Sequence, residues 1–382
     1  MIYSYKADNR EVINELNKRN DAKANRIKKM LKLPDLTRLK SSPIYFITEA
    51  IKHIDILNGF DIVEIPEIVS IRHNFDYLCT PKNHPSRRES DTFYLTDQEV
   101  LRTQTTTMWP YYLKDNRALE TLYSRGLLQA ISYGKVYRND EIDRNHYPVF
   151  HQIDGLSICS NRDKIYQTED LTDVLTAIAK SVYGNDVKWR VENDTFPFTS
   201  PSIELQIWWE NEWTEVLGAG LVHKEVQKNL GIDPQNYNGW AFGFGLDRLA
   251  MIKMDIPDIR ILWSNDERIQ KQFTDINSKF SEVSKYPPVD RDISFLVSKD
   301  LSLNLVYELM RDCGYYENED IIEEVKIIDT YSDEKKFGSN KISYTFRIRY
   351  RSHVRSLKNE EINSVQENLR IKVMNELNAT LR

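Results

Sequence analysis

The chain has 382 residues, of which 29% are charged and 40% hydrophobic, a balance typical of a globular protein with two domains and a short extension. No apolar run of about 18 residues is present, so no membrane-spanning helix is expected. The net charge is −6, which argues against a protein that coats DNA nonspecifically. Any nucleic acid must therefore bind at a local basic surface.

Cysteine usage and the first residues bear on the compartment. Cys79, Cys159 and Cys313 are widely spaced and form no CxxC pair, so neither a disulfide framework nor a bound metal is predicted, and a reducing compartment fits best. The chain starts with neither a secretory signal nor the Arg- and Ser-rich pattern of a transit peptide. Either the protein is not imported or a leader has been removed, so the mitochondrial matrix and the cytoplasm both stay open.

The first two thirds of the chain alternate between strand and helix patterns. Residues 1–42 are polar and are expected to form a helical or loosely ordered extension. From Pro43, isoleucines at helical spacing predict a helix that Asn58 and Gly59 end. Beyond it, the same patterns predict strands at 134–138 and 149–154, a helix at 163–183, a hairpin of 204–209 with 213–217, and a helix at 246–254.

A polar, unpatterned segment at 275–284 is predicted to be a linker between one domain at 43–274 and another at 285–382. The second domain is predicted to contain strands at 292–297, 322–329 and 342–350, with helices at 301–313 and 360–377. This order is that of a ferredoxin-like unit without an obvious last strand. Asn359 is expected to be the N-cap of the last helix.

Residues 134–155 form the first string that carries chemistry, because they place Arg138 at the end of one strand and Phe150 and Asp154 on the next. A guanidinium group matches two phosphate oxygens, a phenylalanine ring offers a flat face to a purine, and a carboxylate can meet an ammonium group. Arg138 alone is more often a solvated residue, with Phe150 buried. The complete string favours a binding site.

Two other strings point the same way. Residues 239–251 contain small residues that permit close approach of a ligand, followed by Arg248 at the start of an apolar helix. A dinucleotide fingerprint would need a third glycine there. Phe196 and Phe198 are two apart, so on a strand they would share one face and could hold an aromatic guest. The competing interpretation of this pair is two core phenylalanines.

Taken together, these strings resemble the motifs of class II aminoacyl-tRNA synthetases: residues 58–66 resemble motif 1, the first string motif 2, and residues 239–251 motif 3. Further segments resemble the phenylalanyl-tRNA synthetases of the single-chain, mitochondrial type: residues 74–76, 84–87, 91–94, 196–199, 255–260 and 266–268, and, in an anticodon-binding domain, 285–288, 292–295 and 350–352. The resemblance covers residues 43–382. It implies an α+β chain with an antiparallel-sheet catalytic domain followed by a ferredoxin-like anticodon-binding domain.

The resemblance also implies an activity. Phenylalanine would be activated with ATP to the aminoacyl-adenylate and passed to the 2′-OH of the terminal ribose of tRNA-Phe. Mg²⁺ would arrive with ATP, no resident metal or membrane is implied, and the relatives of this type act as monomers. Discrimination against tyrosine would depend on the pocket alone, where Ala241 would form the floor.

Carried over position by position, the resemblance implies three groups of binding residues. Catalysis would rest on Arg138 and Arg248. ATP would be bound by Arg138, Asp140, His146, Phe150, Gly245 and Arg248. The amino acid would be bound by Gln104, Thr106, Gln152, Asp154, Phe196, Phe198, Ala241 and Gly243.

A basic stripe in the second domain is the expected contact to tRNA. Arg347, Arg349 and Arg351 alternate and so share one strand face, with Arg355 nearby. Phosphate contacts there would weaken with salt. The alternative is a solvent-exposed face with ion pairs to acidic neighbours.

Several positions at the amino end of the expected pocket depart from the family. Gln104 and Thr106 stand where the family has His and Ser, Asp154 where it has Glu, and Trp109 where Gln is common. Ser200 replaces a metal-binding Glu of the two-subunit relatives. These departures keep two alternatives open: a paralogue that activates another amino acid or loads another acceptor, and a non-catalytic synthetase-like RNA-binding protein.

Overall fold

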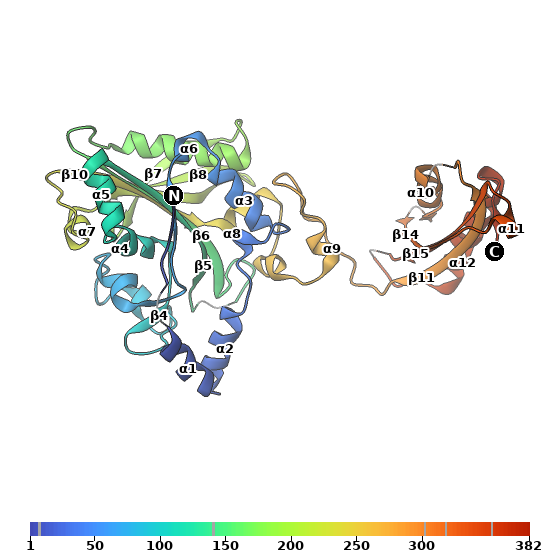
Figure 1. Ribbon diagram of the computed structural model, residues 1–382, viewed down its shortest axis with the longest axis horizontal. Coiled ribbons are helices and arrows are strands. Elements are labelled where there is room, and N and C mark those ends of the chain that lie inside the picture. The colour runs from blue at the N-terminus through green and yellow to red at the C-terminus, as the bar shows by residue number, and fades with distance from the viewer. Residues whose placement is uncertain (7–8, 140–141, 302, 318, 353) are drawn as a thin grey trace. The chain divides into compact units, whose positions relative to one another are not determined.

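The chain folds into two compact units, Met1–Ser281 and Glu282–Arg382 (Figure 1). The computed structural model describes residues 1–6, 9–139, 142–301, 303–317, 319–352 and 354–382. The division between the units falls inside the segment expected to be a linker, and residues 1–42 are part of the first unit. No helix in the described parts of the chain combines the length and apolarity that a membrane crossing requires.

An eight-stranded sheet organises the first unit, in the order β1-β2-β5-β6-β10-β9-β8-β7. Its strands are β1 (Ile2–Ser4), β2 (Asp61–Glu64), β5 (Leu127–Tyr137), β6 (Val149–Ser160), β7 (Trp189–Phe196), β8 (Thr199–Trp209), β9 (Glu212–Val222) and β10 (Tyr237–Gly245). The pairs β1/β2 and β2/β5 are parallel, and the other neighbours are antiparallel. A small second sheet pairs β3 (Ile68–Ser70) with β4 (Glu99–Leu101).

Helices pack against both faces of the large sheet. One face is covered by α3 (Pro43–Lys52), α6 (Thr168–Tyr183) and α8 (Leu246–Lys253), which share one apolar core with the sheet (Figure 1). The opposite face packs against α4 (Met108–Tyr112), α5 (Asn116–Arg125) and α7 (Lys224–Asn229). The remaining helices of this unit are α1 (Arg10–Lys18), α2 (Ala22–Leu31) and α9 (Glu267–Gln270).

Side chains of α1 and α2 form a further small core with the ends of β5 and β6. Leu16, Ala24 and Ile27 pack there with Tyr137 and Val149. The start of α2 is fixed by Asp21, whose carboxylate accepts a hydrogen bond from the backbone N–H of Ala24 at 2.9 Å. Residues 9–42 are therefore an ordered part of the first unit, because the few apolar residues of α1 and α2 lie on one side of each helix.

The predicted elements of this unit exist, but several boundaries were wrong. The helix from Pro43 ends at Lys52, before Asn58 and Gly59, because residues Asp55–Leu57 form a separate 3₁₀ turn. The first string's strands are longer than expected, and the helix predicted from 163 begins at Thr168. The predicted hairpin is confirmed, since β8 and β9 pair around Glu210 and Asn211, which both have positive φ as a tight turn requires.

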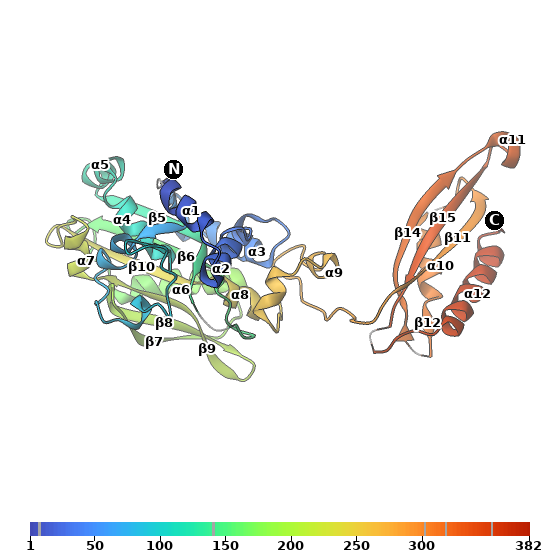
Figure 2. The same ribbon diagram turned by 90° about the horizontal axis from the view of Figure 1, so that it is seen from below.

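The second unit is a four-stranded sheet in the order β14-β15-β11-β16, with helices α10 and α12 against one face (Figure 2). Its elements are β11 (Val289–Ser298), α10 (Leu303–Asp312), β12 (Tyr315–Tyr316), β13 (Glu319–Asp320), β14 (Ile322–Tyr331), α11 (Glu334–Phe337), β15 (Lys341–Tyr350), α12 (Asn359–Glu376) and β16 (Thr380–Leu381). The predicted order of strands and helices is confirmed.

Two details of the second unit differ from the prediction. The last strand of the ferredoxin-like order is present as β16, whose two residues pair with Phe295 and Leu296. So short a strand leaves no periodicity to detect. Asn359 is the first residue of α12 rather than its N-cap; that position belongs to Lys358, whose backbone N–H donates to Glu361 Oε2 at 2.7 Å.

Candidate functional site

The sheet register brings the three strings of the sequence to one face of the sheet. Asp154 on β6 lies opposite Ser132 on β5 and Gly243 on β10. Gly243 in turn lies opposite Gly218 on β9, and Gly218 opposite Glu204 on β8. Because side chains alternate along a strand, Phe150, Gln152 and Asp154 point to this same face. The site is thus built on rigid strands that lie far apart in the sequence.

Asp154 is the centre of the most buried part of the site. Its side chain is only 3% exposed, and its two carboxylate oxygens accept hydrogen bonds from the hydroxyls of Thr105 and Thr106. Burial raises the pKa of Asp154 to about 6, although the two hydroxyls and Arg138 oppose the shift. Among the described residues no cation is hydrogen-bonded to this buried carboxylate, which is thereby prepared to receive a positively charged group.

Of the residues near Asp154, some contact its carboxylate, and others hold the segment of Gln104 to Thr107 in place. Thr106 contacts the carboxylate, while its contact with the amino acid stays a prediction, and Thr105 is a contact that the sequence did not single out. Gln152 Oε1 accepts a hydrogen bond from the Thr105 backbone N–H at 3.3 Å. Gln104 Nε2 instead donates to the carbonyl oxygen of Asn74 at 3.3 Å, so it supports the loop in this structure.

Phe196 and Phe198 lie side by side, with ring centroids 6.2 Å apart and planes 9° apart. The sequence placed both on one strand, but the structure does not: Phe196 ends β7, and Phe198 lies in the turn before β8. Trp109, which is fully buried on α4, meets the Phe198 ring edge-on at 5.8 Å. The three rings form one aromatic wall next to the sheet.

Two glycines keep the floor of the site open. A Cβ atom on Gly243 would lie 2.7 Å from Asp154 Oδ1, and one on Gly218 would lie 2.9 Å from Cζ of Phe196. Any side chain at these positions would displace the carboxylate or the ring. Ala241, two residues before Gly243 on β10, is buried in the same core cluster as Trp109 and Phe198.

Arg138 and Phe150 occupy the end of the β5–β6 pair. Arg138 directly follows β5, and its guanidinium carbon lies 5.0 Å from the centroid of the Phe150 ring, in cation–π contact. Both side chains are accessible at the surface, with Phe150 half-buried. A purine that stacks on this face of Phe150 must therefore move the arginine aside or lie between the two groups.

Arg248 is the third residue of α8, which begins directly after Gly245. Its Nη1 donates to the carbonyl oxygen of Glu215 on β9 at 3.4 Å. Burial and the nearby Glu204 raise the pKa of Glu215, while Arg248 lowers it. Sequence reasoning missed this pair of carboxylates, which come from neighbouring strands and lie within electrostatic reach of each other and of the arginine.

Two predicted ATP contacts, Asp140 and His146, come after β5 in the sequence. His146 is exposed, and its Nδ1 lies 2.9 Å from Asp143 Oδ2 within the loop before β6, a contact that lowers the pKa of Asp143 to about 2. Asp140, the other residue, lies outside the described residues. His146 therefore faces its own loop in this structure, and its contact with phosphate stays a prediction.

A buried pair behind the site links its elements, and the sequence did not indicate it. Asp247, next to Arg248, accepts a hydrogen bond from the backbone N–H of His151 at 2.6 Å and contacts its Nδ1 at 3.3 Å. The Nε2 atom of His151 accepts the backbone N–H of Leu36 at 3.1 Å. These contacts fix the helix that carries Arg248 against the strand that carries Phe150.

Two buried polar atoms near the carboxylate have no hydrogen-bond partner among the described residues: Ser132 Oγ, opposite Asp154, and Trp109 Nε1. Buried polar atoms are rarely left unpaired, so their position favours a ligand or ordered water at this end of the site. Within the same described ranges, no group of three or more His, Cys, Asp or Glu side chains could hold a metal ion.

The basic stripe of the second unit lies on the sheet face opposite α10 and α12. Every arginine of the stripe has an acidic partner: Arg347 pairs with Asp292, Arg349 with Asp290, Arg351 with Glu323 and Arg355 with Glu361. The stripe is therefore largely neutralised within its own domain. Exposed ion pairs are weak, so phosphate groups could compete for these arginines, and their role in tRNA binding stays a prediction.

Comparisons with known proteins give the family. A model described as "tRNA synthetases class II core domain (F)" matches residues 27–273, and one described as "Ferredoxin-fold anticodon binding domain" matches residues 284–382. The chain is 40% identical to the chloroplastic/mitochondrial phenylalanine–tRNA ligase of Arabidopsis thaliana over 84% of this chain and 72% of the relative. It is 34% identical to the mitochondrial enzyme of Dictyostelium discoideum over 82% and 77%, and 36% to that of Mus musculus over 80% and 71%. The chain therefore belongs to the phenylalanine–tRNA ligase family of class II tRNA synthetases.

Proposed function

We propose that the protein activates phenylalanine with ATP and transfers it to the 2′-OH of the terminal ribose of tRNA-Phe. One observation carries this proposal: a buried carboxylate, Asp154, and an aromatic wall lie on the sheet face to which Phe150 points, where Arg138 contacts the Phe150 ring, while Arg248 follows the end of β10 in the first turn of α8. That arrangement offers separate partners to an ammonium group, a benzyl ring and a polyphosphate.

The site offers a partner to each group of phenylalanine. Its ammonium group would pair with Asp154, with Gln152 beside it, and its ring would pack against Phe196 and Phe198. A pocket whose floor is Ala241 would leave the hydroxyl of tyrosine buried without a partner, at a cost of about 1–3 kcal/mol. That cost is a preference of one or two powers of ten, supplied without any editing step.

ATP would lie toward the outer end of the same face. Its adenine would stack on Phe150, in the place that Arg138 covers in the free protein, and Arg138 would turn to the α-phosphate. Arg248 would pack on the adenine's other side, near the γ-phosphate. Mg²⁺ that arrives with ATP neutralises phosphate charge, and Glu204 and Glu215 are the nearby carboxylates that suit it, since Mg²⁺ typically takes one or two carboxylates together with phosphate oxygens.

The chemistry needs no nucleophile from the protein. In the first step a carboxylate oxygen of phenylalanine forms a bond to the α-phosphorus while the bond to the bridging oxygen breaks and pyrophosphate leaves. In the second step the ribose 2′-OH attacks the carbonyl carbon of the adenylate, and AMP leaves. Positioning of the reactants and stabilisation of charge by Arg138 supply the acceleration, as in related displacements at phosphorus.

Phenylalanine-dependent exchange of pyrophosphate into ATP tests this proposal, because it needs neither tRNA nor the second unit. Exchange with phenylalanine is expected, and Arg248→Ala should abolish it. If a panel of amino acids gave exchange with another residue and none with phenylalanine, the paralogue alternative would hold. The shorter carboxylate of Asp154 and its two threonine partners are the features that favour testing the whole panel.

The non-catalytic alternative makes a different prediction, because an RNA-binding protein has no use for an adenylation site. It would bind tRNA and give no exchange with any amino acid.

We further infer an organellar location and a monomeric state, which rest on the named mitochondrial and chloroplast relatives and on their single-chain organisation. Fractionation and the mass of the protein in solution test these two inferences.

A further inference from the structure

Helix α2 carries a second basic surface, distinct from the arginine stripe of the second unit. Five basic residues and no acidic one lie between Ala22 and Lys32, in a chain whose net charge is −6. Lys28 and Lys29 lie in the last turn of α2 and Lys32 is its C-cap residue, and we name these three lysines the α2 basic face. Lys29 and Lys32 are exposed and Lys28 is partly exposed.

The α2 basic face is not neutralised as the arginine stripe of the second unit is. Lys28 Nζ donates to the backbone carbonyl of Arg19 at 2.6 Å, which leaves its positive charge uncompensated. Within the ranges that the structure describes, no carboxylate pairs with Lys29 or Lys32. Lysines held near one another without acidic partners favour a polyanion as ligand.

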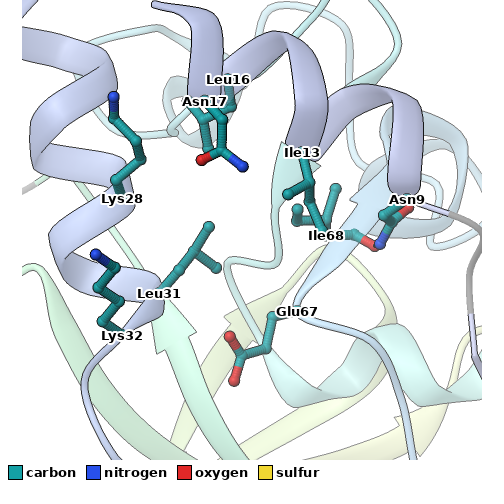
Figure 3. Close-up of a pocket in the computed structure, with 9 residues that line it drawn as sticks. All are labelled: Asn9, Ile13, Leu16, Asn17, Lys28, Leu31, Lys32, Glu67 and Ile68. Atoms are coloured by element: carbon teal, nitrogen blue, oxygen red, sulfur yellow. The ribbon is translucent and has the colours of Figure 1, made fainter. Parts of the chain in front are cut away.

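Two of the three lysines, Lys28 and Lys32, border a hollow that leaves room for such a ligand, whereas Lys29 does not line it. Figure 3 shows Lys28 and Lys32 on α2 bordering a hollow of about 400 Å³, with Asn17 facing them from α1. The carboxylate of Glu67 also lines the hollow, but it is paired with Lys135 at 3.1 Å and accepts the hydroxyl of Tyr137 at 2.7 Å. The charge available to a ligand in the hollow is therefore positive.

Helix α2 is anchored directly beside the strand that leads to Arg138. Arg26 Nη1 donates to Oδ1 of Asn139, the residue after Arg138, at 3.3 Å. At the other end of the helix, Lys135 of β5 donates to the carbonyl oxygen of Leu33 at 2.7 Å. At about 1.5 Å of rise per residue, the α2 basic face begins about 3 Å and ends about 9 Å beyond Arg26 along the helix axis.

We propose that the α2 basic face binds the phosphodiester backbone of tRNA close to its 3′ end. This inference rests on the proposed function, in which the terminal ribose lies at the adenylate beside Arg138. The neighbouring nucleotides of the same RNA then pass over the surface around β5, where α2 is fixed. Lysine ammonium groups bind phosphates as point charges without reading bases, so this contact orients the acceptor end and contributes affinity for any tRNA.

The test uses the full chain with Lys29→Gln and Lys32→Gln combined, a change that removes two positive charges from exposed positions. Phenylalanine-dependent pyrophosphate exchange, measured without tRNA, is expected to stay within about twofold of the unchanged protein. In aminoacylation, the KM for tRNA is expected to rise about tenfold. The dependence of log affinity for tRNA on log salt should become less steep by about 1.5, since each phosphate contact contributes about 0.7–0.9.

Lys180→Gln combined with Lys188→Gln is the matched control. It removes the same charge from two exposed positions, one at the C-terminal end of α6 and one in the loop that follows. This control should leave both the KM for tRNA and the salt dependence unchanged. Equal effects of the two double variants, or an unchanged KM for tRNA in the α2 variant, would overturn the inference. Loss of exchange in the α2 variant would also overturn it, in favour of a structural role, whereas absence of exchange in the unchanged protein would instead defeat the proposed function.

Discussion

Asp154→Asn is expected to separate stability from activity. The substitution keeps the size of the side chain, and the amide can still form hydrogen bonds with the hydroxyls of Thr105 and Thr106. What it removes is a negative charge in a position that is only 3% exposed. No cation from the part of the chain that the structure describes is hydrogen-bonded to that charge, so the charge costs folding free energy that the bound substrate would recover.

The magnitude follows from the pKa of Asp154, which burial raises from 3.8 to about 6. Since the pKa in the folded state is the higher one, ionisation of this group destabilises the fold. The cost grows as the pH rises from about 4 to 6 and is fully present above that range. It amounts to about 3 kcal/mol at pH 8 and to about half of that at pH 5. The asparagine variant should therefore be the more stable protein, by up to this amount.

Activity should change in the opposite direction. A hydrogen bond to a charged partner contributes about 1.5–3 kcal/mol, so the KM for phenylalanine in pyrophosphate exchange should rise on the order of 10- to 100-fold. Urea unfolding of the protein and its variant at pH 8 and pH 5, followed by tryptophan fluorescence, measures the stability difference. Asp173→Asn, which removes the same charge from an exposed position on α6, is the control and should show no gain. A variant that is less stable at pH 8, or that keeps an unchanged KM, would refute the reasoning.

Three further predictions follow from the geometry. The KM for phenylalanine should rise as the pH falls through about 6, because Asp154 takes up a proton; exchange kinetics between pH 5 and pH 8 measure this. Gly243→Ala places a Cβ atom 2.7 Å from Asp154 Oδ1 and should raise the KM for phenylalanine at least tenfold while that for ATP changes little. Asp247→Ala leaves two buried donors of His151 unpaired and should destabilise the protein by about 2–4 kcal/mol in urea unfolding. An unchanged value in any of these measurements would contradict the corresponding contact.

The sequence predicted what depends on short-range pattern. The hairpin around Glu210 and Asn211 follows from alternating strands on either side of polar turn residues, and the order of elements in the second unit follows from a change between helical and strand periodicity. The three strings could be recognised because each lies on two strands that follow one another in the sequence, or on one strand and the helix after it. Residues that are close together in the sequence of such a segment are also close together in the folded protein.

What could not be predicted depends on contacts between distant residues or on the local path of a turn. Thr105 and Thr106 both reach the carboxylate because they lie in a 3₁₀ turn, Thr105–Thr107, where neighbouring side chains diverge less than on a strand. The pairing of Arg347 with Asp292 joins residues 55 positions apart, so spacing alone could not decide between a tRNA contact and a neutralised face. The anchoring of α2 beside Arg138 depends on Asn139, 113 positions from Arg26.

If the protein activates phenylalanine as proposed, the carboxylate, the aromatic wall and the two guanidinium groups hold one aminoacyl-adenylate. Isotopic exchange of pyrophosphate into ATP, measured with each of the twenty amino acids in turn, tests this most directly. We expect exchange that depends on phenylalanine, is far weaker with tyrosine, and disappears with Arg248→Ala. Absence of exchange with phenylalanine, or equal exchange when Arg248 is replaced, would contradict it.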